Sequence, residues 1–164
     1  VTLKIMKRTF LFTLLVALLS MSATVAWGQK RANLEGIWQL CFYVSGSQDT
    51  PGTLRAGNTF KILSEDGHIT NFTVIPGRGA IITGLGTYKV KNNVLRESMK
   101  KNIHLPMLDG RDNDLQFTLS EDGNVMSVKF FLKEDAQGHV IDAWHYETWR
   151  RVEMPAEYPQ DLVR

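Results

Sequence analysis

The chain has 164 residues, of which 43% are apolar and 22% are charged, with 19 basic residues, 17 acidic residues and one cysteine. The apolar content excludes an intrinsically disordered chain, and a single cysteine excludes an internal disulfide. Beyond residue 28 the chain holds 16 basic and 17 acidic residues, and this near-neutral balance argues against nucleic acid as a partner. The composition is that of one small globular domain.

Residues 1–28 have the pattern of a secretory signal peptide: a basic start, an apolar run and small residues before Gln29. The alternative is a membrane anchor, but the apolar run is about half of the ~20 residues that a spanning helix needs. We therefore expect cleavage near Gln29 and export to the periplasm or the exterior. The mature chain, residues 29–164, is then expected to form a single domain without stable membrane insertion.

Beyond residue 35 the sequence alternates β-branched and aromatic residues with a period of two, and Gly, Asn and Asp interrupt the runs. Helical periodicity is nearly absent. Eight strands are predicted, over residues 36–44, 59–63, 68–75, 80–91, 94–101, 115–119, 125–132 and 140–152. The spacing is that of an up-and-down meander, which predicts an all-β fold.

The connections between these strands differ in length. The second, fourth and sixth are short, and two of them, Ser64–Gly67 and Ser120–Gly123, contain the turn signal Asp-Gly. In a meander these three connections lie at one end. The other four, three of which are long, lie at the opposite end. Because closure removes exposed strand edges, we predict an eight-stranded antiparallel up-and-down barrel with one tight end and one loop-rich end.

Three short motifs suggest a family. Gly36-Ile37-Trp38 lies on the first strand, Gly86-Thr87-Tyr88 on the fourth, and Trp149 with Arg151 on the last. In this the chain resembles the lipocalin or calycin group, and in particular secreted bacterial lipocalin-like domains of unknown function. The resemblance implies a lipocalin-like barrel over roughly residues 34–152 and no particular activity.

Haem-binding relatives continue the first motif with Gly-x-Gly, whereas Gln39, Leu40 and Cys41 follow Trp38 here. We therefore expect no haem. The phosphate-loop, dinucleotide, zinc-protease and serine-hydrolase motifs are absent as well. No cofactor and no catalytic residues are predicted.

The aromatic and charged residues expected near the tight end form a candidate site. The simpler interpretation is a structural cluster in which a guanidinium stacks on an indole and pairs with a carboxylate. Whether Arg150 or Arg151 stacks stays open. The members of this predicted closed-end cluster are Trp38, Tyr88, Glu97, Trp149 and Arg151.

Two acidic groups could bind metal. His145 and Glu147 lie two apart on one strand with Asp142 nearby, but no paired histidine or cysteine spacing completes a site. The segment Asp109–Asp114 lacks the calcium-loop pattern and is typical of a turn. We expect no metal at either place.

The predicted interior is apolar and aromatic, which suits a small hydrophobic ligand or an equally apolar filled core. The leading hypothesis is a ligand-binding barrel that acts as a monomer or weak homodimer. One alternative is a protein-interaction or inhibitor-like module that uses the loop His104–Leu108; another is a cofactor-free enzyme with His145 or Glu97 as base. The residues predicted to line the interior are Phe42, Val44, Phe60, Phe72, Phe117 and Phe130.

Overall fold

The eight strands close into one antiparallel up-and-down barrel, in which each strand pairs with its neighbours in the chain and β8 pairs with β1. The structure is a computed structural model that describes residues 32–44, 52–153 and 155–157. The predicted fold class is confirmed. The predicted signal peptide, residues 1–28, lies outside the described residues.

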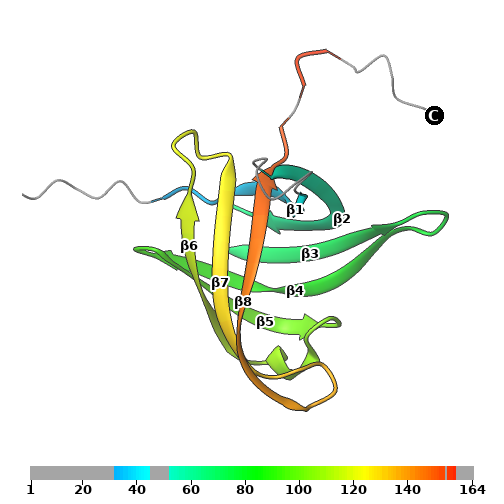
Figure 1. The fold of residues 1–164 in the computed structure, drawn as a ribbon, viewed down its shortest axis with the longest axis vertical. Coiled ribbons are helices and arrows are strands. Elements are labelled where there is room, and N and C mark those ends of the chain that lie inside the picture. Colours follow the sequence, from blue (N-terminus) through cyan, green and yellow to red (C-terminus); the bar gives the residue numbers. More distant parts are fainter. Residues whose placement is uncertain (1–31, 45–51, 154, 158–164) are drawn as a thin grey trace, which may run out of the picture. The chain divides into compact units, whose positions relative to one another are not determined.

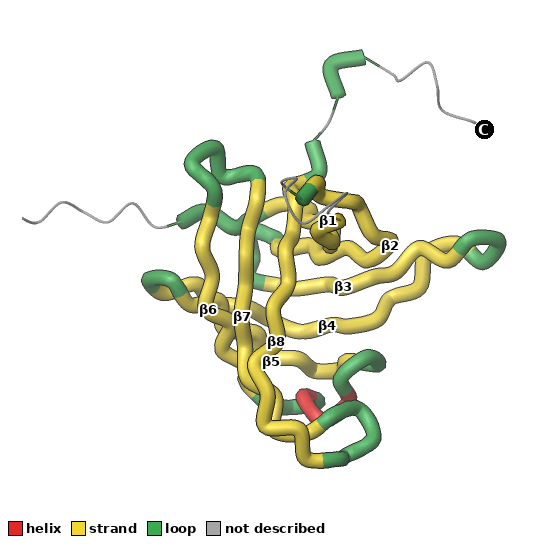
Figure 2. Tube along the Cα trace, in the orientation of Figure 1, coloured by secondary structure: helices red, strands yellow, loops and turns green. Residues whose placement is uncertain are grey.

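The strands are β1 (Gly36–Val44), β2 (Thr53–Leu63), β3 (His68–Ile75), β4 (Gly79–Lys91), β5 (Val94–Asn102), β6 (Asp112–Leu119), β7 (Val125–Glu134) and β8 (Val140–Arg151). In Figure 1, β6, β7 and β8 run across the direction of β2 to β5. One 3₁₀ turn, η1 (Pro106–Leu108), precedes β6. Figure 2 shows it in red at the same end as the β7–β8 connection.

Two strands begin several residues earlier than predicted. β2 begins at Thr53 instead of residue 59, because residues 53–56 pair with the end of β1. β6 begins at Asp112 instead of residue 115, because Asp112 and Asp114 pair with Ser98 and Arg96 on β5. Both extensions are mostly polar, and alternation alone does not reveal them.

The three short connections form turns at the tight end. In the β2–β3 turn Gly67 N donates to Ser64 O at 2.9 Å, and in the β6–β7 turn Gly123 N donates to Ser120 O at 2.9 Å. In the β4–β5 turn Asn92 has a φ of 53°, a left-handed conformation that asparagine tolerates. These turns agree with the predicted ones.

The tight end is closed by Trp38 and the segment before β1. The Trp38 indole is fully buried, and its Nε1 donates to Leu34 O at 2.8 Å. The Arg151 guanidinium lies 4.3 Å from the centre of that ring. It also donates to the carbonyls of Asn33, at 3.1 Å, and Glu35. One arginine thus holds the entering chain over the end of the barrel.

The apolar core fills the half of the barrel next to this closed end. Leu63, Ile69, Leu95 and Met126 are each 1% exposed or less. No helix among the described residues is long and apolar enough to cross a membrane. Toward the loop-rich end, polar side chains join the apolar ones that line the interior.

Candidate binding site in the barrel interior

A cavity of about 360 Å³ occupies the loop-rich half of the barrel. Each of the eight strands contributes at least one lining residue, and His104, Leu105 and Leu108 from the β5–β6 connection complete it. A space lined by every strand is the interior of the barrel and not a surface groove. Its volume is in the range of sites for small molecules.

The floor of the cavity is a buried ion pair. Lys61 Nζ on β2 donates to Glu97 Oε1 on β5, and both side chains are less than 10% exposed. Because β3 and β4 separate these strands, the pair spans the interior. Lys61 Nζ also lies 4.7 Å from the centre of the Trp149 ring, in cation–π contact. The apolar core lies on the other side of this pair.

Glu147 on β8 is the second carboxylate in the cavity. Its Oε2 accepts a hydrogen bond from Trp149 Nε1 at 2.8 Å. Burial raises the pKa of Glu147 because a charged carboxylate is poorly solvated there, and the charge of Glu97 adds to this effect. Lys61, the Trp149 bond and His145 lower the pKa without cancelling the effect of burial.

The raised pKa of Glu147 predicts that its presence destabilises the fold as the pH rises. The folded state binds this proton more tightly than the unfolded state. The stabilising contribution of the bound proton is therefore full below the ordinary pKa of 4.5, and it is lost as the pH rises through the raised pKa of the folded state. The melting temperature of Glu147→Gln, relative to that of the wild type, should therefore rise between pH 4 and pH 8. Thermal unfolding of both proteins at several pH values measures this difference.

The exposed aspartates with lowered pKa values, such as Asp66 and Asp135, have the opposite pH dependence. They are present in both proteins and cancel in the comparison. A difference in melting temperature that does not change with pH would contradict the account of Glu147.

Three buried polar atoms in the cavity lining have no hydrogen-bond partner. They are Asn71 Oδ1 on β3, Thr83 Oγ1 on β4 and His145 Nε2 on β8. Leaving a buried polar atom unpaired costs about 1–3 kcal/mol, and such atoms in a native structure call for an explanation. Here all three face one cavity, so a bound molecule could pair with them.

Part of the cavity wall is apolar. Leu40, Leu115, Phe130 and Leu132 line it from β1, β6 and β7. The Phe130 ring stacks on the His145 ring with centroids 5.7 Å apart. Leu105 and Leu108 pack against the core from the β5–β6 connection. The cavity is therefore amphiphilic, with an apolar wall beside polar groups from β2 to β6 and from β8.

The structure corrects the predicted interior on β2 and β3. Lys61 and Asn71 line the cavity, so alternation places their neighbours Phe60 and Phe72 on the outer face. There the two rings stack with centroids 4.9 Å apart. The prediction placed the face with the larger side chains inside. The buried Lys61–Glu97 pair instead puts the Lys61 face of β2 inside.

Phe42 and Val44 do not line the cavity either, because they are 57% and 44% exposed. β1 pairs with β8 only from Trp38 to Cys41, so its last residues extend beyond the closed part of the barrel. Of the other predicted residues, Phe130 lines the cavity. Phe117 is buried in the core.

The predicted closed-end cluster is divided between two places. Trp38 and Arg151 stack at the tight end, and Tyr88 lies there too, since its hydroxyl donates to Ser64 O at 2.9 Å. Arg151 stacks and Arg150 is exposed. Glu97 and Trp149 contact Lys61 at the cavity floor instead. The carbonyls of Asn33 and Glu35, not a carboxylate, accept from the guanidinium.

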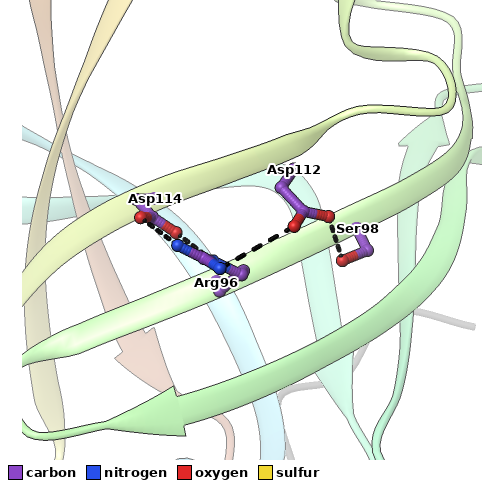
Figure 3. Close-up of polar contacts among 4 residues, drawn as sticks. All are labelled: Arg96, Ser98, Asp112 and Asp114. Atoms are coloured by element: carbon purple, nitrogen blue, oxygen red, sulfur yellow. Dashed lines mark hydrogen bonds and ion pairs between the residues drawn. The ribbon is translucent and has the colours of Figure 1, made fainter.

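The acidic residues of the segment Asp109–Asp114, which runs into β6, contact neighbouring residues. Figure 3 shows Arg96 pairing with both carboxylate oxygens of Asp114, at 2.6 and 2.7 Å, while Ser98 donates to Asp112 at 2.6 Å. The Arg96 guanidinium lowers the pKa of Asp114. Asp109 accepts from Lys101 and from the backbone of Asn102. Within the described ranges no three His, Cys, Asp or Glu residues are grouped as metal ligands.

Lys61, Asn71 and Thr83 do not stand out in the sequence. Lys61 lies between Phe60 and Ile62, and Asn71 precedes Phe72, so each looks like a solvent-facing residue of an amphipathic strand. A usable signal was the polar phase of β2, where Thr59 and Lys61 alternate with Phe60 and Ile62. Such a phase can belong either to solvent or to a polar interior.

One family model, described as "Domain of unknown function (DUF4488)", matches residues 33–160. This range contains all eight strands of the barrel and every strand residue that lines the cavity. No curated protein matches the chain significantly.

Proposed function

The chain belongs to the DUF4488 family, and we propose that it binds a small amphiphilic molecule inside its barrel. The observation that carries this proposal is the cavity of about 360 Å³, in which three unpartnered buried polar atoms stand beside an apolar wall. The polar part of the molecule binds near Asn71, Thr83 and His145. Its apolar part packs against Phe130, Leu132 and their neighbours.

Two favourable contributions support such binding. Each hydrogen bond to an unpartnered atom relieves a penalty of about 1–3 kcal/mol. The apolar wall adds about 25 cal/mol for each Å² of surface removed from water. A purely hydrophobic ligand, as the sequence suggested, would leave the polar atoms unpaired. We therefore favour an amphiphilic ligand over a hydrophobic one.

The proposal extends to the cellular setting. The predicted signal peptide and the resemblance to lipocalins support an exported, lipocalin-like carrier in the periplasm or outside the cell. A protein-interaction module has less support, because Leu105 and Leu108 from the β5–β6 connection pack inward and do not form an exposed apolar patch. A cofactor-free enzyme also has less support, because Glu97, one of its two candidate bases, is paired with Lys61.

Leucine methyl groups provide a test because they mark distinct places in the barrel. Leu40, Leu105, Leu108, Leu115 and Leu132 line the cavity, Leu63 and Leu95 lie below its floor, and Leu85 is exposed. We expect titration with 1-hexanol, followed by methyl NMR, to shift the signals of the cavity leucines. The signal of Leu85 should not move.

A variant with a filled cavity gives the matched control. Thr83→Phe places a ring in the cavity, whereas Ile82→Phe changes the neighbouring, exposed position of β4. The shifts should be lost in Thr83→Phe and kept in Ile82→Phe. Shifts confined to Leu85, or no shifts in a folded wild-type protein, would disprove binding in the interior.

A further inference from the structure

The charged groups of the cavity are unevenly matched. Lys61, Glu97, Glu147, His104 and His145 are the titratable residues in its lining. Lys61 is committed to Glu97 at the floor. Among the ion pairs of the described residues, none includes Glu147. The cavity therefore contains two carboxyl groups and one lysine, and that lysine is in direct ion-pair contact with Glu97 and acts on Glu147 only from a distance.

The unpartnered atoms have the same preference as this surplus carboxylate. Asn71 Oδ1 is an acceptor, Thr83 Oγ1 can accept, and His145 Nε2 accepts when the ring proton is on Nδ1. A ligand that brings hydrogen-bond donors satisfies them. A carboxylate or phosphate ligand could accept from the Thr83 hydroxyl, but it would face Asn71 Oδ1 and two carboxyl groups.

We infer that the ligand carries a protonated amine, and that Glu147 is the residue that neutralises it. This inference rests on the proposed function, because it names the chemical class of the molecule in the same cavity. The Trp149 indole supports it, since its N–H orients the Glu147 carboxyl. An apolar body attached to the amine packs against Phe130 and Leu132.

Proton balance follows from the state of the empty site. Burial raises the pKa of Glu147, so its carboxyl holds a proton more tightly in the empty site than in solution. An ammonium beside it lowers that pKa again, and the proton that Glu147 gives up goes to the solvent while the ligand keeps its own charge. Binding of an amine is therefore coupled to proton release, and binding of a neutral alcohol is not.

Three probes with the same six-carbon chain test the inference: hexylamine, 1-hexanol and hexanoate. Calorimetry at pH 7 should show hexylamine binding about tenfold or more tightly than 1-hexanol, and hexanoate most weakly. Repeating the hexylamine titration in buffers of different ionisation enthalpy should show release of up to one proton. The Glu147→Gln variant should lose both the preference for the amine and the proton release.

Glu134→Gln is the matched control, because Glu134 is exposed at the end of β7 and is not part of the cavity lining. It should bind all three probes as the wild type does. Equal binding of all three probes, or a preference for hexanoate, would overturn the inference and leave the proposed function standing. Failure of every probe to bind the wild type would overturn the proposed function itself. Both of these results are measured on the wild type, so neither depends on whether a variant folds.

Discussion

Replacing Trp38 by alanine should lower the free energy of unfolding by about 3–5 kcal/mol, the usual range for a buried tryptophan. The indole is fully buried. Its removal leaves a cavity, deprives the Leu34 carbonyl of its donor and takes away the ring on which Arg151 stacks. Urea denaturation followed by circular dichroism measures the loss.

Two further variants separate packing from the stacked arginine. Trp144→Ala removes the same side chain from the outer face, where it is 48% exposed, and should cost much less. Arg151→Ala keeps the indole but releases the carbonyls of Asn33 and Glu35, so its loss should fall between the other two. Equal losses for Trp38→Ala and Trp144→Ala would refute the closed-end plug.

Replacing Lys61 by methionine should destabilise the protein by about 3–5 kcal/mol, because it leaves the buried Glu97 carboxylate without its partner. The double variant Lys61→Met, Glu97→Met should recover most of the stability, since it removes both charges. Unfolding of the wild type, the two single variants and the double variant completes the cycle.

The exposed pair of Arg96 and Asp114 is the control for this cycle. It has good two-bond geometry but lies in solvent on the outer face of β5 and β6. A coupling energy of at most about 1 kcal/mol is expected there. Equal coupling energies for the exposed and the interior pair would show that Lys61 and Glu97 do not span a buried interior.

The barrel was predictable because its main signals are local. Alternation marks the strands, and Asp-Gly at residues 66–67 and 122–123 marks two of the tight turns. The early starts of β2 and β6 were missed because Thr53–Asn58 and Asp112–Asp114 are polar, and their pairing partners are what make them strands. The stacking of Arg151 on Trp38 requires the β1–β8 seam that closes the barrel.

The interior was harder to predict because alternation does not say which face is inside. On β2, either Phe60 and Ile62 or Thr59 and Lys61 could face the interior. Hydrophobicity favours the first pair, but Glu97 on β5 gives Lys61 a partner across the barrel. That contact joins residues 36 positions apart, so no local pattern shows it. The same reversal placed Phe72 outside and Asn71 inside.

Native mass spectrometry of the protein purified gently from its own host tests most directly whether the cavity holds a small molecule. We expect the wild type and Ile82→Phe to carry a reproducible adduct that disappears on denaturation. The Thr83→Phe protein, with its cavity filled, should show the bare mass of the chain. A bare mass for all three folded proteins, or an adduct that persists in Thr83→Phe, would contradict the binding-barrel account.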